Sequence, residues 1–256
     1  MITKTEGIVL KTLKYGEADL IVTYLTPDRG LIRAFAKSSR KTKSRFGSSL
    51  EPLTHARIAL WGKEQTSLSK ITQADILNSF HPIRENYNDF VYVSKLAETL
   101  ISFTPEAIPN IRLFAFFLNI LNIIKDTDLQ GSTSLHIISQ IRLLKHLGFA
   151  PRLSSCGRCG GMSHDFYPDA GTTLCPSCVK DPRHQSKPFV KISNQAIHFY
   201  SHCIEWPIDK SNRLKPNQGT LAELSGILDR HVSFMLSKKL MTSKFIENRG
   251  TASKRQ

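Results

Sequence analysis

Two Cys-x-x-Cys pairs constrain the fold of this chain more than any other feature. Fifteen residues separate the first pair, Cys156 and Cys159, from the second pair, Cys175 and Cys178. Two residues between thiols let one tight turn aim both sulfurs at a single ion, and the linker is long enough to return with the second pair. The spacing therefore predicts a closed, structural site in which four thiolates hold one Zn²⁺.

Other arrangements of these residues stay open from sequence alone. The four thiols could form two disulfides or remain free, and His164, between the pairs, could replace one cysteine. Gly157, Gly160 and Gly161 are expected to supply the turn of the first pair. A bound ion could contribute on the order of 10 kcal/mol to folding of the segment, which is poor in apolar residues from Gly161 to Thr173. The fifth cysteine, Cys203, is interpreted as a packed thiol on a helix.

The charge of the chain is large and unevenly distributed. The 256 residues carry a formal charge of +14. Residues 1–80 have 13 basic and 7 acidic side chains, residues 81–150 have 6 of each, and residues 151–256 have 16 and 8. Two basic ends around a neutral middle indicate a polyanionic partner, nucleic acid before membrane, with generic solubility charge as the alternative.

The apolar content suits a cytoplasmic protein with real cores. Hydrophobic residues make up 40% of the chain, yet no apolar run approaches the length of a bilayer span. The first twenty residues carry charges within their apolar stretch and show no cleavage site, so we expect no signal peptide. A metal-type cysteine pattern also fits a reducing compartment.

The first eighty residues alternate like the strands of a small barrel. We expect strands over residues 6–10, 18–25, 31–36, 55–61 and 65–76, with turns at Tyr15–Glu17 and Pro27–Gly30. Five strands with no strong helix among them predict a closed barrel of the OB type over residues 1–80. A partly open SH3-like barrel is the alternative.

A basic loop is expected between the third and fourth strands. Seven basic residues and no acidic one lie from Arg29 to Arg45, and small polar residues separate the charges, so the loop can follow a phosphate backbone. Five contacts to phosphates of single-stranded DNA would make log K fall against log salt with a slope of about −3.5. Phe46 is expected to plug the barrel mouth, with stacking on a base as the alternative. The candidate DNA-binding residues are Lys11, Lys14, Arg29, Arg33, Lys37, Arg40, Lys41, Lys43 and Arg45.

The rest of the chain has helical periodicity. We expect helices over residues 87–103, 109–125 and 134–147 before the cysteines, and over 194–206 and 221–240 after them. Asn88 is the expected cap of the first helix, and Gly148 is expected to end the third in a left-handed conformation. The prediction is an α+β protein: an OB barrel, then an all-helical domain over residues 81–256 with the zinc module inserted at about 151–182. A basic tail at about 248–256 is expected to be disordered.

Several strings of the sequence resemble a known family. EGIVLKTLKYGEADLIVTYLTPDRGLIRAFAK, SRFGSSLEPL, IRLLKHLGFAPRLSSCGRCG and KLMTSKFI occur in this order. Together they resemble the bacterial DNA repair protein RecO family over nearly the whole chain. One departure is Ser38, which stands where the family commonly has glycine, so a backbone that needs positive φ there would be less comfortable.

The resemblance implies a non-enzymatic mediator of DNA repair and recombination. It implies binding of single- and double-stranded DNA and annealing of complementary strands in the RecF, RecO and RecR pathway. With RecR, the family helps load RecA onto strands coated by single-stranded-DNA-binding protein, so RecF and RecA are indirect partners and the nucleoid is the expected location. It also implies the four cysteines as zinc ligands and the basic barrel residues as DNA contacts. The acidic tail of the coat protein, which has an apolar end, needs an apolar groove with cationic side chains at its rim. Arg142 and Lys145 are candidates for this rim, with a solvated helix face as the alternative.

Two other function classes compete with this interpretation. A zinc-ribbon module for protein interaction or transcription, without direct DNA annealing, would also fit the metal pattern and the basic tail. A zinc hydrolase fits poorly, because four thiolates leave no open position on the ion. The nine histidines are scattered and are interpreted as surface or core residues.

Overall fold

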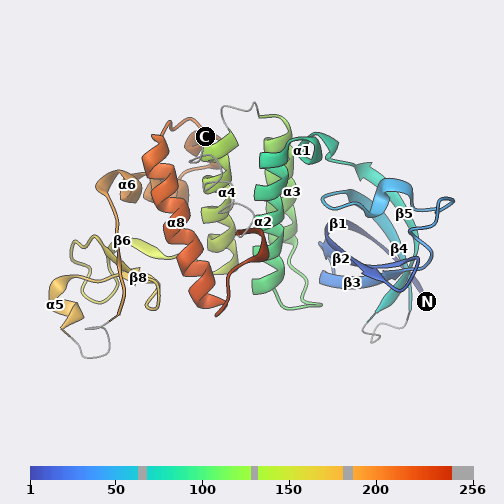
Figure 1. The fold of residues 1–256 in the computed structure, drawn as a ribbon, viewed down its shortest axis with the longest axis horizontal. Coiled ribbons are helices and arrows are strands. Elements are labelled where there is room, and N and C mark those ends of the chain that lie inside the picture. The colour runs from blue at the N-terminus through green and yellow to red at the C-terminus, as the bar shows by residue number, and fades with distance from the viewer. Residues whose placement is uncertain (63–67, 128–131, 181–186, 244–256) are drawn as a thin grey trace, which may run out of the picture. The chain divides into compact units, whose positions relative to one another are not determined.

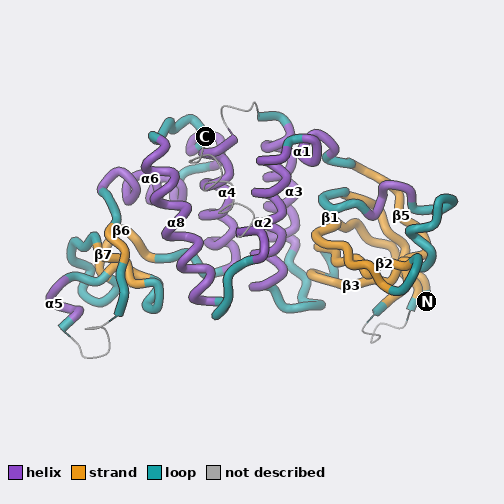
Figure 2. The backbone as a smooth tube through the Cα atoms, in the orientation of Figure 1, coloured by secondary structure: helices purple, strands orange, loops and turns teal. Residues whose placement is uncertain are grey.

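The structure, a computed structural model, describes residues 1–62, 68–127, 132–180 and 187–243 (Figure 1). The basic tail expected to be disordered, at about 248–256, lies outside the described residues. The chain divides into two compact units, Met1–Asp126 and Thr127–Gln256. The first unit joins a barrel to helices and the second joins helices to a small sheet, so the α+β class is confirmed (Figure 2).

Five strands of the first unit form a closed barrel in the order β1-β2-β3-β5-β4. The neighbours β3 and β5 are parallel and the other neighbours are antiparallel. A closed five-stranded barrel confirms the predicted OB type and excludes the partly open alternative. The strands are β1 (Ile2–Tyr15), β2 (Asp19–Thr26), β3 (Gly30–Ala36), β4 (His55–Trp61) and β5 (Ser69–Asn78).

Strand β1 closes the barrel because it pairs with two neighbours. Residues Ile2 to Ile8 pair with β4, and residues Ile8 to Tyr15 pair with β2. The register shifts between Val9 and Lys11, and such a bulge bends a strand. The strand is 14 residues long, far longer than the predicted residues 6–10, because pairing on both sides holds its polar ends in extended conformation.

Two aromatic side chains, Tyr24 and Phe46, fill the barrel core. The fully buried ring of Tyr24 lies against Gly7, where an added Cβ would come within 3.0 Å of Tyr24 Cδ1. Phe46, which precedes the short helix η1 (Gly47–Leu50), is 4% exposed and packs in the same core. Phe46 is therefore the expected plug, and stacking of its ring on a base is excluded.

Helices α1 (His81–Glu85), α2 (Tyr87–Phe103) and α3 (Ile111–Lys125) complete the first unit. The bounds of α2 are those predicted. Its predicted cap at Asn88 is wrong: the side chain of Asn86 accepts from the backbone N–H groups of Asn88 and Asp89. Asn88 thus lies in the first turn, where its own amide needs an acceptor.

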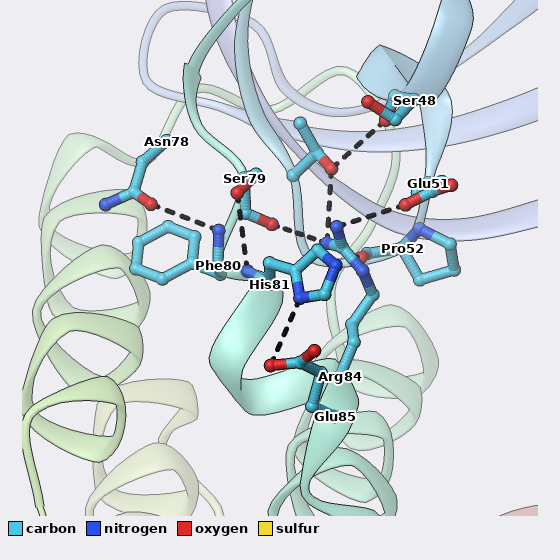
Figure 3. A network of polar contacts seen from close by, with 10 residues as sticks. Ser48, Glu51, Pro52, Asn78, Ser79, Phe80, His81, Arg84 and Glu85 are labelled. Carbon is cyan, nitrogen blue, oxygen red and sulfur yellow. Dashed lines mark hydrogen bonds and ion pairs between the residues drawn. The ribbon is translucent and has the colours of Figure 1, made fainter.

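Arg84 of α1 connects this helix to the barrel through hydrogen bonds and an ion pair (Figure 3). Its guanidinium donates to the carbonyl of Pro52 at 3.1 Å and to that of Ser79, and pairs with Glu51 at 3.0 Å. The side chain is only 15% exposed. One cation therefore satisfies backbone acceptors from the segments before β4 and after β5.

In the second unit, helices from both sides of the cysteine segment pack together. Helix α4 packs against α6 and α8, and α6 packs against α8, so the cysteine module is an insert within a helical framework, as predicted. Gly148 after α4 has φ +81°, which confirms the left-handed end. The elements are α4 (Ser132–Leu147), β6 (Arg152–Cys156), β7 (Asp165–Tyr167), β8 (Thr172–Thr173), α5 (Pro176–Val179), β9 (Val190–Lys191), α6 (Asn194–Glu205), α7 (Ile208–Ser211) and α8 (Gln218–Met235). In the described part of the chain, no helix combines the length and apolarity needed to cross a membrane.

Candidate metal centre and nucleic-acid interface

The four predicted ligands meet at one point. The sulfur atoms of Cys156, Cys159, Cys175 and Cys178 all lie within 4.8 Å of one another, and 3.6 Å separates Cys159 Sγ from Cys175 Sγ. Sulfurs bound tetrahedrally at about 2.3 Å from an ion would lie about 3.8 Å apart. All four are free thiols rather than disulfides, so the cluster can hold a metal ion.

Backbone hydrogen bonds around the first pair shape the cluster. The N–H of Gly160, at φ +74°, donates to Cys156 O at 2.9 Å. The N–H of Gly157 donates to Thr173 O, and an added Cβ at Gly157 would lie 2.5 Å from Thr172 Oγ1. The glycines thus supply the turn, as predicted, and allow β8 to bring the second pair close. The small sheet is ordered β6-β8-β7-β9.

Hydrogen bonds within the cluster shift the pKa values of Cys156, Cys175 and Cys178 in different directions. Burial raises the pKa of Cys156, but backbone N–H donors, that of Cys159 first, outweigh burial and lower the pKa to about 6. The backbone of Cys178 likewise lowers the pKa of Cys175. Hydrogen bonding with Cys175 and Cys159 raises the pKa of Cys178 to about 12. A cation bound here would displace the remaining protons.

The two other candidates near the module have different roles. His164 Nε2 lies 2.7 Å from Asn194 Oδ1, and His164 is not among the clustered ligands, so its substitution for a cysteine is wrong. Cys203 is fully buried, and burial raises its pKa to about 12. That confirms the interpretation of Cys203 as a packed thiol.

Four of the predicted DNA-binding residues line one concavity of the barrel unit, which we call the cationic concavity. Its volume is about 290 Å³. The lining residues are Lys37, Ser38, Lys41, Lys43, Ser44, Arg45 and Lys70. Lys70 was missed from the sequence, because only the parallel pairing of Phe35 with Lys70 brings β5 beside the loop. Among the described residues that line it, five are cations and none is acidic, so mutual repulsion favours an anionic ligand.

The loop that carries these cations is folded into turns against the barrel. Ser38 N donates to Asp19 Oδ1 at 2.6 Å, and Arg40 N donates to Ala18 O at 2.9 Å. Ser38 has φ +55°, so the backbone strain expected from a non-glycine residue at this position is present. The guanidinium of Arg45 lies 4.9 Å from the centre of the Phe46 ring.

Two other predicted cations lie in a cleft with balanced charge. Arg33 Nε pairs with Glu106 Oε1 at 2.9 Å, and Arg29 Nε lies 4.0 Å from Asp28 Oδ2. The cleft has a volume of about 420 Å³, and all four of these residues line it. Because carboxylates already neutralise the two arginines, this cleft is a poorer phosphate site than the cationic concavity.

The remaining candidates occupy separate places. Lys11 and Lys14 are exposed on β1, and Arg40 Nη1 donates to Glu17 O at 3.1 Å. In the second unit, Lys145 is exposed and its Nζ donates to Ile204 O at 2.7 Å. Arg142 is half-buried, and burial lowers the pKa of its guanidinium.

These features define an α+β protein of the OB-barrel class with an inserted four-cysteine module. Two family models match the chain: "Recombination protein O N terminal" over residues 1–80 and "Recombination protein O C terminal" over residues 84–244. The chain therefore belongs to the RecO family.

Curated relatives agree over nearly the full length. The DNA repair protein RecO of Thermodesulfovibrio yellowstonii is 38% identical over 234 residues, which cover 91% of this chain and 92% of the relative. That of a Dehalococcoides mccartyi strain is 30% identical over 243 residues, covering 92% and 91%. That of Rubrobacter xylanophilus is 33% identical over 189 residues, covering 72% and 75%.

Proposed function

We propose that this chain is a non-enzymatic mediator of DNA repair and recombination that binds single- and double-stranded DNA. Family membership supports the DNA repair role. The cationic concavity is the observation that carries the DNA-binding proposal, because it gathers five cations from the loop and β5 with no acidic residue among its described lining. Residues 1–80 would be the DNA-binding domain, and residues 81–256 the helical domain.

The proposed activity is annealing of complementary strands. Two single strands repel each other, and a basic protein that neutralises both lowers the barrier to pairing without any acid–base group. The barrel would hold one strand, while the basic carboxy-terminal part could hold a second. Together with RecR, the chain would help load RecA onto strands coated by single-stranded-DNA-binding protein.

Binding of a labelled oligonucleotide across a salt series tests the proposal. Five phosphate contacts on single-stranded DNA predict a slope of about −3.5 in log K against log salt. Replacing Lys37, Lys41 and Lys43 with Ala should lower the affinity and flatten the slope by about 2. A charge-matched control replaces Lys4, Arg57 and Arg112, which are exposed in the first unit and do not line the concavity. Equal losses in both triple variants would show that net charge, not the concavity, binds DNA.

We propose that the four-cysteine cluster holds Zn²⁺. Four thiolates in a closed tetrahedral set suit this ion and leave no position for catalysis. Elemental analysis should find one zinc per chain, and Cys175→Ser should abolish it. A metal-free wild-type protein that is stably folded would contradict the proposal.

We also propose Arg142 and Lys145 as the cationic rim for the acidic tail of the coat protein. Exposure of Lys145 supports this proposal, while Arg142 is half-buried and its Nη2 donates to Ser211 Oγ at 3.5 Å. Lys145→Ala should weaken binding of an acidic, apolar-ended peptide in fluorescence anisotropy. Unchanged binding would leave these residues as part of a solvated helix face.

A further inference from the structure

A row of apolar side chains crosses the outer face of the barrel. Leu13 on β1 pairs with Ile21 on β2, and Ile21 pairs with Phe35 on β3. Directly paired residues share one face of a sheet, and the chain neighbours of Ile21 and Phe35 fill the core, so the row faces outward. Tyr15 lies edge-on to Phe35 with ring centres 5.8 Å apart. We call Leu13, Tyr15, Ile21 and Phe35 the outer row.

The outer row is exposed to a degree that core packing does not explain. Leu13 is 56% exposed and Tyr15 is 55% exposed, while Ile21 and Phe35 are half-buried. A strand face of this kind favours a ligand with flat apolar surfaces.

Cations flank the outer row on both sides. On one side, Lys11 pairs with Thr23 and so shares the face of the row, while Arg33, the partner of Thr23 on β3, is already matched by Glu106. On the other side, Lys37 directly follows β3. Arg40 lies against the turn between β1 and β2, because its backbone N–H and its guanidinium donate to carbonyls of that turn.

Two acidic residues also lie at the Lys37 end of the row. The carboxylate of Asp19 accepts the backbone N–H of Ser38, and the backbone carbonyl of Glu17, in the turn, accepts from Arg40. An apolar and aromatic middle with cationic borders matches a single strand, which presents unpaired bases and two sides of phosphate charge.

We propose that the outer row is a stacking platform for unpaired bases, with Tyr15 and Phe35 as its aromatic surfaces. This inference rests on the proposed DNA binding and deepens it, because it predicts a preference for single strands and assigns that preference to particular residues. A duplex keeps its bases stacked inside and can use only the flanking cations. The cationic concavity therefore supplies affinity for any phosphate chain, while the outer row distinguishes single from double strands.

Three fluorescein-labelled probes of equal length test the platform with the full-length protein: an oligothymidylate, a strand of abasic sites and a duplex. Tyr15→Ala should weaken binding of the oligothymidylate on the order of tenfold or more. Binding of the abasic strand and the duplex should stay unchanged, and so should the salt slope, since no charge is removed. Tyr15→Trp should retain the wild-type affinity for the oligothymidylate.

Two control variants separate the possible outcomes. Phe234→Ala removes a similarly exposed aromatic ring from α8 and should change nothing. Lys41→Ala should weaken all three probes and flatten the single-strand slope by about 0.7. The platform is overturned if Tyr15→Ala binds the oligothymidylate like wild type, or if its affinity for the abasic strand falls equally. DNA binding would then stand, and the outer row would be a contact for a protein partner. A wild-type protein that ignores all three probes at low salt overturns both proposals.

Discussion

Ser38 holds a left-handed backbone conformation without being glycine. Its φ is +55°, and its N–H is fixed by Asp19. This conformation costs a non-glycine residue about 1–2 kcal/mol, whereas the extra freedom of glycine in the unfolded chain costs about 0.5–1 kcal/mol. The difference is small and favours glycine at this position.

We therefore expect Ser38→Gly to stabilise the barrel by about 0.5–1 kcal/mol. The chain has two tryptophans, so Trp61 fluorescence in a Trp206→Phe background reports urea unfolding of the barrel. Ser38→Ala keeps the strain and should leave the midpoint nearly unchanged. A Ser38→Gly protein less stable than wild type would show that the hydroxyl matters more than φ.

His231 couples α8 to the cysteine module as a neutral ring. It is 4% exposed, its Nε2 lies 2.8 Å from Phe149 O, and its ring lies 6.0 Å from that of Phe166. The carbonyl can only accept, so Nε2 carries the proton. Burial lowers the pKa of His231 below its usual 6.5.

The second unit should lose stability as the pH falls below about 6.5. The unfolded chain binds a proton at His231 in this range and the folded chain does not, so the stabilisation is present above 6.5 and is lost towards the lower folded pKa. Urea unfolding followed by Trp206 fluorescence in a Trp61→Phe background measures it. His231→Gln should be less stable at pH 8, but its free energy of unfolding should depend less on pH. An equal pH dependence in both proteins would assign the effect to other groups.

At the scale of elements, α1 depends on one arginine. Arg84 bonds the carbonyls of Pro52 and Ser79 and pairs with Glu51 (Figure 3). Its loss would leave the half-buried carbonyls of Pro52 and Ser79 without their charged donor, and such a loss costs about 1–3 kcal/mol.

Arg84→Met should destabilise the barrel unit by about 2 kcal/mol, because methionine keeps the aliphatic packing and removes the donors. Trp61 fluorescence in urea again provides the measurement. Arg57→Met removes an exposed arginine of β4 and should shift stability by less than about 0.5 kcal/mol. Equal effects of the two substitutions would mean that the network in Figure 3 contributes nothing specific.

At the scale of the whole molecule, the candidate metal centre and the proposed DNA site belong to different compact units. The cysteine cluster lies in Thr127–Gln256 and the cationic concavity in Met1–Asp126. Binding of a structural ion is folding free energy for the unit that holds it.

Removing the metal should therefore destabilise one unit selectively. With a strong chelator, the unfolding transition reported by Trp206 should move to lower urea, because the free energy of unfolding falls by several kcal/mol. Added Zn²⁺ should restore it. The Trp61 transition and oligonucleotide binding at the barrel should change little. A parallel collapse of both transitions would show that the metal supports the whole chain.

Local patterns were sufficient for much of this protein. The spacing of the cysteines predicted the two pairs, because a tight turn needs only its own residues to aim two sulfurs, although pairing of β6 with β8 brings the two pairs together. Periodicity predicted α2 to the residue and β4 likewise, and Gly148 predicted its own left-handed conformation. These features depend on neighbours within a few positions along the chain.

Only the tertiary structure decided which charges and rings act together. Arg33 and Glu106, 73 residues apart, form a pair, and parallel pairing of β3 with β5 adds Lys70 to the cationic concavity. The outer row exists because the register between β1, β2 and β3 aligns Leu13, Ile21 and Phe35. Cross-strand register and long-range ion pairs depend on how a closed barrel packs, and sequence spacing carries no direct record of that packing.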